Sequence, residues 1–323
     1  MSRKTKSIVV GLVCIIIGFV GGVFTGKSRG IPFVKRQWKL SIGIYSGKSP
    51  FDVAAPPNVK NPVLNPRDVR DVQAQHVADP FMVFEDGTWF MFFEVFHRKS
   101  QQDIGLATSS DGFNWTYKQI VLDEPFNLSY PYVFKWNNQY YMIPSSALNS
   151  TWIYKAVNFP TEWSRAGKLL DGGQYADPSI FCFRDKWWMF AETSTGRHDT
   201  LRLYCADNLM GPWAEHPKNP IISRDANIAR PGGRVVIIDG RVFRYAQDCD
   251  PVYGNQVRAF EITKLTTTSY EEKEIDGNPV LKGSGTGWNS LGMHHIDPHQ
   301  IGENQWIACV DGFKKTLVFG LKY

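Results

Sequence analysis

Acidic residues recur at fixed places in this sequence, and their pattern suits a site for polyhydroxylated ligands. Asp79, Asp177 and Asp297 each stand directly before a proline at the entry to an apolar segment. Tyr130 and Arg230 hold the same place in two further copies of that segment. Hydrolysis of a glycosidic bond requires two facing carboxyl groups, one of them protonated and one acting as base or nucleophile. Crowded carboxyl groups move each other's pKa values apart and can supply both forms.

A second polar position recurs at the end of the hairpin that each of these segments begins. Each proline-led segment leads to a polar turn and then to a second strand rich in aromatic and β-branched residues, such as residues 88–94. The residues that end these second strands are Glu94, Ser145, Glu192, Gln247 and Asp311. Because the two ends of a hairpin lie at one edge, we expect both polar sets at one mouth of a shared channel. The alternative is that each Asp-Pro pair only caps the turn that enters its strand.

The hairpin-led unit occurs five times, and this repetition predicts the fold. The first four units each continue through a third strand to a fourth strand that begins with an aromatic residue. The fifth unit ends at Tyr323, too soon for a fourth strand, and residues 37–45 supply an unused strand at the front. Donation of that strand would close the ring and remove an open sheet edge. We therefore predict an all-β fold, a five-bladed β-propeller over residues 37–323; a pair of β-sandwiches is the alternative.

The N-terminus has the pattern of a membrane anchor. Residues 8–24 form an uncharged apolar run with basic residues on both sides, about 26 Å long as a helix. A cleavable signal peptide is the alternative, although the run is longer than a usual signal core. We predict a short basic tail at residues 1–7, a transmembrane signal anchor at 8–25 and a stalk at 26–36. The propeller is then expected on the extracytoplasmic or lumenal side of the membrane that this single helix spans.

The distribution of charge excludes a nucleic-acid partner. The formal net charge is +5, but seven of the 36 Lys and Arg residues lie in residues 1–36, which contain no acidic residue. The remainder therefore has 29 basic residues against 31 acidic residues. A nearly neutral domain lacks the basic surface that a phosphate backbone requires.

Several segments resemble those of known carbohydrate-active propellers. The motifs Asp79-Pro80-Phe-Met-Val-Phe-Glu-Asp-Gly87 and Asp177-Pro178-Ser-Ile-Phe look like the entry motifs of five-bladed glycosidases of the family 43 furanosidase superfamily. More closely, the segments HVADPF, IGLATSSDGFNWTY and YYMIPSS resemble the N-terminal propeller of plant glucosamine inositol phosphorylceramide transferases and their bacterial relatives. The transferase domain that follows in the plant proteins has no counterpart in this sequence. We therefore do not expect this chain to be a glycosyltransferase on its own.

The resemblance to the glycosidases implies roles for the acidic residues. Asp79 matches the base that activates water, and Asp177 matches the residue that orients and tunes the acid. The acid itself, a Glu that opens the fourth blade, is replaced by Arg230. If hydrolysis is retained, we expect Glu192, or as second choice Glu94, to act as the acid. Arg230 suits an anionic group on the ligand or an ion pair with Asp177 or Glu192, and both roles stay open.

Further residues at the expected mouth are assigned to ligand binding. Tyr130 and Tyr132 are expected to stack on sugar rings, and Gln247, His295 and Asp297 complete the predicted set. We predict no metal site and no cofactor, because the histidines lack the spacing of a zinc site. The furanosidase resemblance alone implies a hydrated calcium ion in the channel beside a histidine such as His295.

Two functions are compatible with this pattern. The first is a membrane-anchored carbohydrate-active propeller that resembles an inverting glycoside hydrolase. The second is a non-catalytic domain that binds a glycan or a glycolipid headgroup and assists a partner glycosyltransferase. The replacement of the family acid by Arg230 favours the second. A purely structural interaction propeller is disfavoured, because a protein-binding face would favour an apolar centre over a polar mouth.

Overall fold

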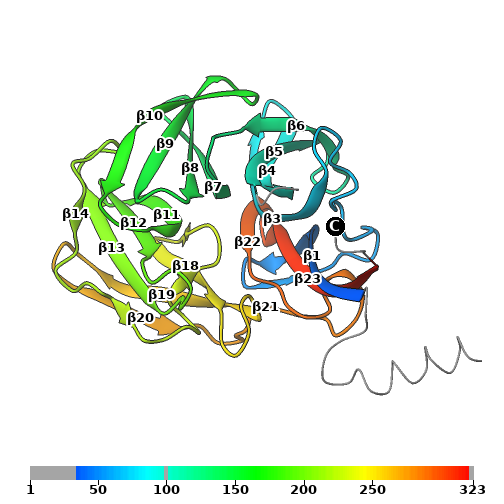
Figure 1. Cartoon of the computed structure of the whole chain (residues 1–323). Coiled ribbons are helices and arrows are strands. Elements are labelled where there is room, and N and C mark those ends of the chain that lie inside the picture. The colour runs from blue at the N-terminus through cyan, green and yellow to red at the C-terminus, as the bar shows by residue number, and fades with distance from the viewer. Residues whose placement is uncertain (1–33, 98–100, 320–323) are drawn as a thin grey trace, which may run out of the picture. The chain divides into compact units, whose positions relative to one another are not determined.

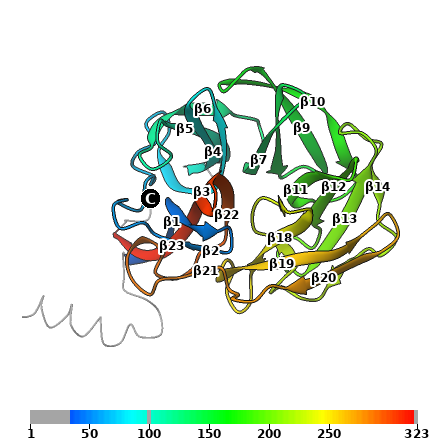
Figure 2. The same cartoon turned by 180° about the vertical axis from the view of Figure 1, so that it is seen from behind.

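The computed structural model describes residues 34–97 and 101–319 and is built from five antiparallel sheets (Figures 1 and 2). Its body, Leu40–Lys314, is the predicted five-bladed propeller. A smaller unit contains the outer ends of two strands, where the Lys315 ammonium lies 5.0 Å from the centre of the Trp38 ring. The predicted anchor at residues 8–25 lies outside the described residues. Within the described residues, no helix has the length and apolar content that crossing a membrane requires.

Each sheet is one blade, and successive blades follow the order of the chain. Blade 1 contains β3 (Ala74–Glu85), β4 (Thr88–His97), β5 (Gln101–Ser109) and β6 (Thr116–Leu122). Blade 2 contains β7 (Leu128–Trp136), β8 (Gln139–Ser146), β9 (Ser150–Asn158) and β10 (Glu162–Asp171). Blade 3 contains β11 (Ala176–Phe183), β12 (Lys186–Glu192), β13 (Thr200–Ala206), β14 (Ala214–Glu215) and β15 (Ile222–Ser223).

The last two blades are less regular. Blade 4 contains β16 (Arg230–Pro231), β17 (Val236–Ile238), β18 (Arg241–Asp248), β19 (Gln256–Leu265), β20 (Tyr270–Glu274) and β21 (Leu281–Lys282). A short 3₁₀ helix, η2 (Gly287–Asn289), precedes blade 5. Blade 5 contains β22 (Ile296–Gly302), β23 (Gln305–Phe319), β1 (Val34–Ser49) and β2 (Asp52–Ala54).

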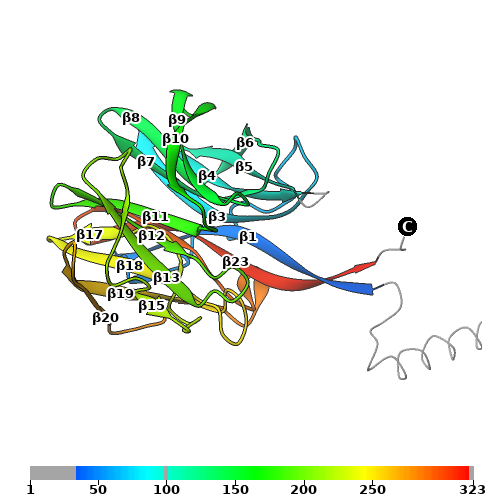
Figure 3. The same ribbon diagram turned by 60° about the vertical axis from the view of Figure 1, so that its left-hand side comes forward.

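The N-terminal segment closes the ring, as the sequence predicted, but it contributes two strands instead of one. The strand order in blade 5 is β2-β1-β23-β22, and β1 and β23 run side by side (Figure 3). The donated strand β1 is therefore the third strand of the blade and not the fourth. The fourth position is taken by β2, which pairs with the end of β1 through Ser46 and Ala54. The prediction missed β2 because three residues are too few to show alternation.

The second strand of each blade buries side chains against both neighbouring blades. In β4, Met91 and Phe93 belong to the cluster that also contains Ile42 and Ile44 of β1. Phe92, between them, belongs to the cluster shared with blade 2. Successive side chains of a strand point to opposite faces, so a strand between two blades must be apolar on both. This explains why the aromatic second strands recur in the sequence.

A β-bulge gives the proline-led strands of blades 1 to 3 a shared geometry. In β3, Asp79 and Pro80 together lie opposite the single residue Phe93. The same extra residue occurs at Tyr130 in β7 and at Asp177 in β11. These residues have φ angles of 51°, 47° and 52°, in the left-handed region that non-glycine residues rarely adopt. Bulges of this kind redirect a side chain and are frequent beside functional sites.

Blade 5 lacks this bulge, which corrects the prediction for Asp297. Its pairing with β23 is regular from Ile296 to Gln300, and Asp297 lies opposite Cys309 instead of Asp311. The fully buried carboxylate of Asp297 accepts hydrogen bonds from Met82 N (2.5 Å) and from the Arg234 guanidinium. It therefore faces the interior of the channel and not the mouth at which the other acids were expected.

Arg234, between β16 and β17, holds four blades together inside the channel. Its guanidinium pairs with Asp297 of blade 5, and its Nη2 donates to Val133 O at 2.9 Å and Met82 O at 3.3 Å. It also lies 5.1 Å from the centre of the Tyr132 ring. Burial alone would lower the pKa of Arg234, but the Asp297 charge keeps it above its usual range. The ion pair and the aromatic ring therefore fill the middle of the channel.

We expect Arg234→Met to lower the free energy of unfolding by about 3–5 kcal/mol, because it leaves the buried charge of Asp297 without its partner. Arg241→Met removes a largely exposed partner of Glu261 and is the matched control, with an expected loss below about 1 kcal/mol. Urea unfolding of both variants beside the wild type measures the difference. Equal losses for the two variants would contradict the role assigned to Arg234.

Candidate functional site

The predicted acids gather at one mouth of the channel. We call Asp79, Glu94, Asp177, Glu192 and Asp311 the acid mouth, and all five side chains are buried. The negative charges of Glu94, Asp177 and Asp311 each raise the pKa of Asp79, and the charge of Asp177 raises the pKa of Glu192. The bulges place these residues, because they turn Asp79 and Asp177 away from the regular pleat. The hairpin argument therefore located this cluster correctly, whereas the structure does not test the roles assigned to its members.

Asp79 is joined to blade 5 by its backbone and by a histidine. Asp79 N donates to Asp311 Oδ2 at 2.9 Å. The Nδ1 of His294 lies 2.9 Å from Asp311 Oδ1 and 3.8 Å from Asp79 Oδ1. Burial alone would lower the pKa of His294, but the Asp311 carboxylate raises it to about 9. At neutral pH His294 is therefore a cation that compensates the charge of Asp311.

Two carboxyl groups of the acid mouth, those of Asp79 and Glu94, have raised pKa values. Burial raises the pKa of Asp79 well above its usual range, and the nearby carboxylates act in the same direction. Burial also raises the pKa of Glu94 to about 7, although Gln102 donates a hydrogen bond to its Oε1 at 2.7 Å. A general base must be ionised to accept a proton. Asp79 in its neutral form does not meet that requirement.

Arg230 forms an ion pair with Asp177, one of the two roles that the sequence left open. Its Nε donates to Asp177 Oδ2 at 2.7 Å, and its Nη1 lies 2.8 Å from the Nδ1 of His198. Gln247, which is fully buried, donates to the same carboxylate oxygen at 2.9 Å and to Pro231 O. Gln247 therefore lies at the acid mouth as predicted, where it orients Asp177.

Glu192 is held by the loop that follows its strand. Its Oε1 accepts a hydrogen bond from Ser194 N and contacts the Ser194 hydroxyl at 2.7 Å. The Ser194 hydroxyl in turn contacts Asp199 Oδ1 at 2.6 Å. Burial raises the pKa of Glu192, although the Ser194 contacts oppose the shift. A raised pKa is the direction that a general acid needs.

Three residues assigned to ligand binding lie deeper than predicted. The Tyr130 hydroxyl contacts Ser179 Oγ at 2.8 Å and bonds with both N and O of Gly233, which leaves its ring fully buried. Tyr132 is also buried and packs against Phe81. The His295 Nε2 donates to Pro80 O at 2.9 Å behind Asp79. The prediction placed these side chains at the rim, but the structure buries them towards the channel axis.

An exposed aromatic ring at the acid mouth was missed in the sequence. Tyr253, in the loop between β18 and β19, is 40% exposed. Its ring centre lies 5.2 Å from the Arg230 guanidinium, 5.1 Å from the His198 ring and 5.4 Å from the His294 ring. Tyr253 occurs in one loop only and has no counterpart at the repeated strand ends. A search for repeated positions therefore could not find it.

A polar cavity of about 290 Å³ adjoins Arg230. Its lining is made largely by polar residues of blades 2 and 3, among them Ser129, Ser145, Gln174 and Thr195. Gln102, which binds Glu94, also lines it. The cavity therefore extends the acid mouth with hydrogen-bonding groups that are suited to hydroxyl groups.

The calcium ion implied by the glycosidase resemblance does not fit these residues. Among the described residues, Asp79, His294 and Asp311 form a group that brings three donor atoms within 4.8 Å of one another. Calcium takes six to eight oxygen ligands, and a protonated histidine is not a ligand. The cationic His294 already compensates Asp311, and Arg234 with Asp297 fills the channel axis. We therefore derive no step through a metal ion.

Comparison with known proteins identifies the family. A family model described as "Glucosamine inositolphosphorylceramide transferase 1, N-terminal" matches residues 35–313. The chain belongs to this family. It is 36% identical over 307 residues to the rice (Oryza sativa subsp. japonica) glucosamine inositolphosphorylceramide transferase 1, covering 87% of this chain and 41% of the relative. The Arabidopsis thaliana protein of the same name is 32% identical over 300 residues, covering 85% of this chain and 39% of that relative.

Solved structures share the fold of this transferase N-terminal family. The catalytic domain of a Coprinopsis cinerea GH62 α-L-arabinofuranosidase has a TM-score of 0.56 at 13% identity, covering 74% of this chain and 91% of that domain. An exo-β-1,3-galactanase from Clostridium thermocellum has a TM-score of 0.54 at 13% identity, covering 65% of this chain and 51% of that protein. The fold is thus that of glycoside hydrolases, while the chain spans about two fifths of the length of the curated transferases that it matches.

The His294 charge predicts a specific dependence of stability on pH. The pKa of His294 is about 9 in the folded protein, against 6.5 for an unperturbed histidine such as that of the unfolded chain, so folding favours protonation of His294. This contribution is fully present below pH 6.5 and is lost as the pH rises through about 9. We expect the stability difference between wild type and His294→Gln to shrink by about 3 kcal/mol over that range, measured by urea unfolding. A difference that stays constant from pH 6 to pH 9.5 would contradict a cationic His294.

Proposed function

We propose that the acid mouth binds a glycan or a glycolipid headgroup without hydrolysing it. The observation that carries this proposal is a set of three buried carboxyl oxygens that have no hydrogen-bond partner in the protein. These atoms are Asp79 Oδ1, Asp177 Oδ1 and Glu192 Oε2. A buried polar atom that stays unpaired costs about 1–3 kcal/mol, so a ligand that supplies hydrogen bonds to all three gains affinity. Sugar hydroxyl groups are donors of this kind.

The surroundings of these oxygens fit a sugar ring. In Asp177, the two protein donors, Arg230 and Gln247, both bind Oδ2 and thereby hold the carboxylate in one orientation. Tyr253 offers an exposed aromatic face beside them, against which the apolar face of a sugar can pack. Arg230 is positioned to contact an anionic group of the ligand as well, because it lines the polar cavity.

The same geometry argues against hydrolysis. Arg230 replaces the glutamate that would be the acid, and its guanidinium is committed to Asp177. Burial and the neighbouring carboxylates raise the pKa of Asp79, the residue assigned as base, and so disfavour the ionised form that a base requires. The residues assigned to catalysis therefore act as hydrogen-bonding groups in this proposal: Asp79, Asp177, Glu192 and Glu94.

Inverting hydrolysis is the second candidate, and one observation favours it. Glu94 has a pKa of about 7, which is matched to a general acid at neutral pH, and its charge acts on Asp79. In that case Asp79 would lose its proton when the ligand binds, and Glu94 or Glu192 would protonate the leaving group.

The setting that we propose is a membrane surface beside a glycosyltransferase. The apolar run at residues 8–24 supports a single-pass anchor at 8–25, with the propeller on the extracytoplasmic or lumenal side. The partner is supported by the relatives, which carry the name transferase and extend well beyond the part that this chain matches. In this arrangement the propeller holds the headgroup and a separate enzyme transfers the sugar.

A glycan array followed by calorimetric titration of the full-length protein in detergent tests the binding. We expect Tyr253→Ala to weaken the selected ligand at least tenfold, which corresponds to about 1.4 kcal/mol. Arg230→Met should have a similar effect, because it frees Asp177 from its fixed orientation. Met210→Ala, an exposed apolar residue elsewhere, is the control and should bind as the wild type does.

The same ligand, incubated with the protein for many hours, should be recovered intact. Release of a sugar product that Asp79→Asn abolishes would contradict the binding proposal and establish the second candidate. If no glycan binds, or if binding does not depend on Tyr253, both candidate functions of the acid mouth are overturned.

A further inference from the structure

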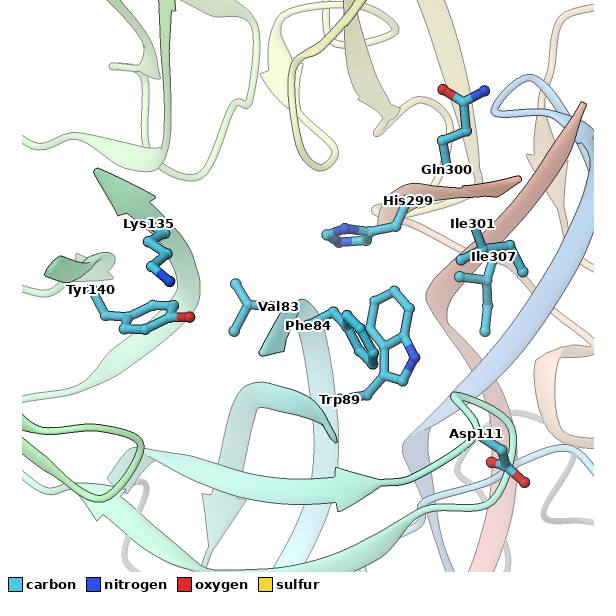
Figure 4. A pocket seen from close by; sticks show the side chains of 10 residues that line it. All are labelled: Val83, Phe84, Trp89, Asp111, Lys135, Tyr140, His299, Gln300, Ile301 and Ile307. Atoms are coloured by element: carbon cyan, nitrogen blue, oxygen red, sulfur yellow. The ribbon is translucent and has the colours of Figure 1, made fainter. Parts of the chain in front are cut away.

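The opposite end of the channel contains a larger pocket, of about 590 Å³, that plays no part in the acid mouth (Figure 4). It lies where the inner strands end: Val83 and Phe84 near the end of β3, Lys135 near the end of β7, and Ile301 near the end of β22. Its size is within the range of about 300–1,000 Å³ that is typical of small-molecule sites. We call it the distal pocket.

The interior of the channel separates the distal pocket from the acid mouth. Arg234 and Asp297 pair on the channel axis, and Arg234 also contacts the backbone of Met82 and Val133. Tyr130, nearer the acid mouth, bridges to Ser179 and Gly233. A ligand in one mouth therefore does not reach the other, and the two sites can be tested independently.

A fixed imidazole reaches into the distal pocket. The Nε2 of His299 lies 3.0 Å from Asp297 Oδ2, and His299 and Trp89 meet edge to face at 5.5 Å between ring centres. The ion pair with Arg234 and the contact with His299 outweigh burial and hold the pKa of Asp297 below its usual range. A carboxylate can only accept, so Nε2 carries a proton in this contact. The Nδ1 atom is left for a ligand, to which a hydroxyl group can serve as hydrogen-bond donor or acceptor.

The other charged groups of the distal pocket are already paired. The Lys135 ammonium contacts Glu85 Oε1 at 2.5 Å and lies 5.3 Å from the centre of the Tyr140 ring. Asp111 accepts hydrogen bonds from the backbone of Phe113 and Asn114 within its own turn. The pocket therefore offers hydrogen-bonding atoms without an uncompensated charge. This excludes a phosphate or another strongly anionic ligand and favours a neutral one.

Aromatic rings form much of the remaining wall. Phe84 is 53% exposed and lies 5.0 Å from Trp89 between ring centres. Figure 4 shows the Lys135 amine, the Tyr140 hydroxyl and the His299 ring directed into the same space, with Phe84 and Trp89 beside them. A ligand that matches this wall needs an apolar face together with several hydroxyl groups.

We infer that the distal pocket is a second binding site, for a short neutral oligosaccharide. An apolar ligand would leave His299 Nδ1, and the N–H groups of Lys135 that do not contact Glu85, without a hydrogen-bonding counterpart in a desolvated site. A sugar satisfies these groups with its hydroxyls and packs its C–H face on Phe84. The inference does not depend on the ligand of the acid mouth.

Titration of the full-length protein with neutral oligosaccharides of two to four units, from the cello-, xylo-, manno- and galacto-series, tests this site. We expect Phe84→Ala and His299→Ala each to weaken the binding of the selected sugar at least tenfold. Phe84 is exposed, so its variant should unfold at the wild-type temperature. Val157→Ala, an exposed apolar residue on β9, is the control and should bind as the wild type does.

Three outcomes would overturn the inference. The first is that no sugar of the panel binds in a Phe84-dependent manner. The second is that Val157→Ala weakens binding as much as Phe84→Ala does. The third is that Phe84→Ala binds no differently but shifts the oligomeric state in sedimentation, which would assign this end to a protein contact. Loss of binding in Tyr253→Ala alone would instead concern the acid mouth.

Discussion

The burial of charge along a narrow channel is the constraint on which the rest of this structure depends. An unpaired ion in such a place costs several kcal/mol, so each buried carboxylate needs a cation or a proton. Three are compensated by cations, in the pairs Arg234–Asp297, Arg230–Asp177 and His294–Asp311. Burial instead raises the pKa values of Asp79 and Glu94, that of Glu94 to about 7, which favours their protonated forms. The pairs Arg234–Asp297 and Arg230–Asp177 join neighbouring blades, so these charges also stabilise the fold.

This compensation gives the two ends of the channel different chemistry. At the acid mouth, the cations bind one oxygen of a carboxyl group and leave the other for a ligand, as in Asp177. At the distal pocket, Asp297 is engaged by Arg234 and Met82 and orients His299. The chain belongs to a transferase N-terminal family and has a hydrolase-type fold, and this difference between the two ends underlies our proposal that it binds sugar without cleaving it. Arg230 is the residue that separates binding from hydrolysis in our proposal. A cation paired with Asp177 stands where the glycosidase resemblance places the acid.

The repeat in the sequence predicted the fold, the closure of the ring and the clustering of Asp79, Glu94, Asp177 and Glu192. It could do so because strand ends in a hairpin repeat necessarily meet at one edge. The repeat could not predict depth along the channel, because the pairing register differs between blades: Asp79 and Asp177 lie in bulges, whereas Asp297 pairs directly opposite Cys309. That is why Asp297 was misplaced. Tyr253 and Arg234 were missed for a different reason: both lie in connections that occur once, and only the folded chain brings them to the channel.

Our central claim is that Asp79 has a raised pKa and serves in ligand binding instead of catalysis. The most direct test is the protonation state of that side chain, read from its carboxyl carbon by ¹³C NMR and assigned with Asp79→Asn. We expect this carboxyl carbon to titrate well above the usual pH range of an aspartate, because burial raises the pKa of Asp79. Titration within the usual range of an aspartate would contradict the raised pKa and restore Asp79 as a competent general base.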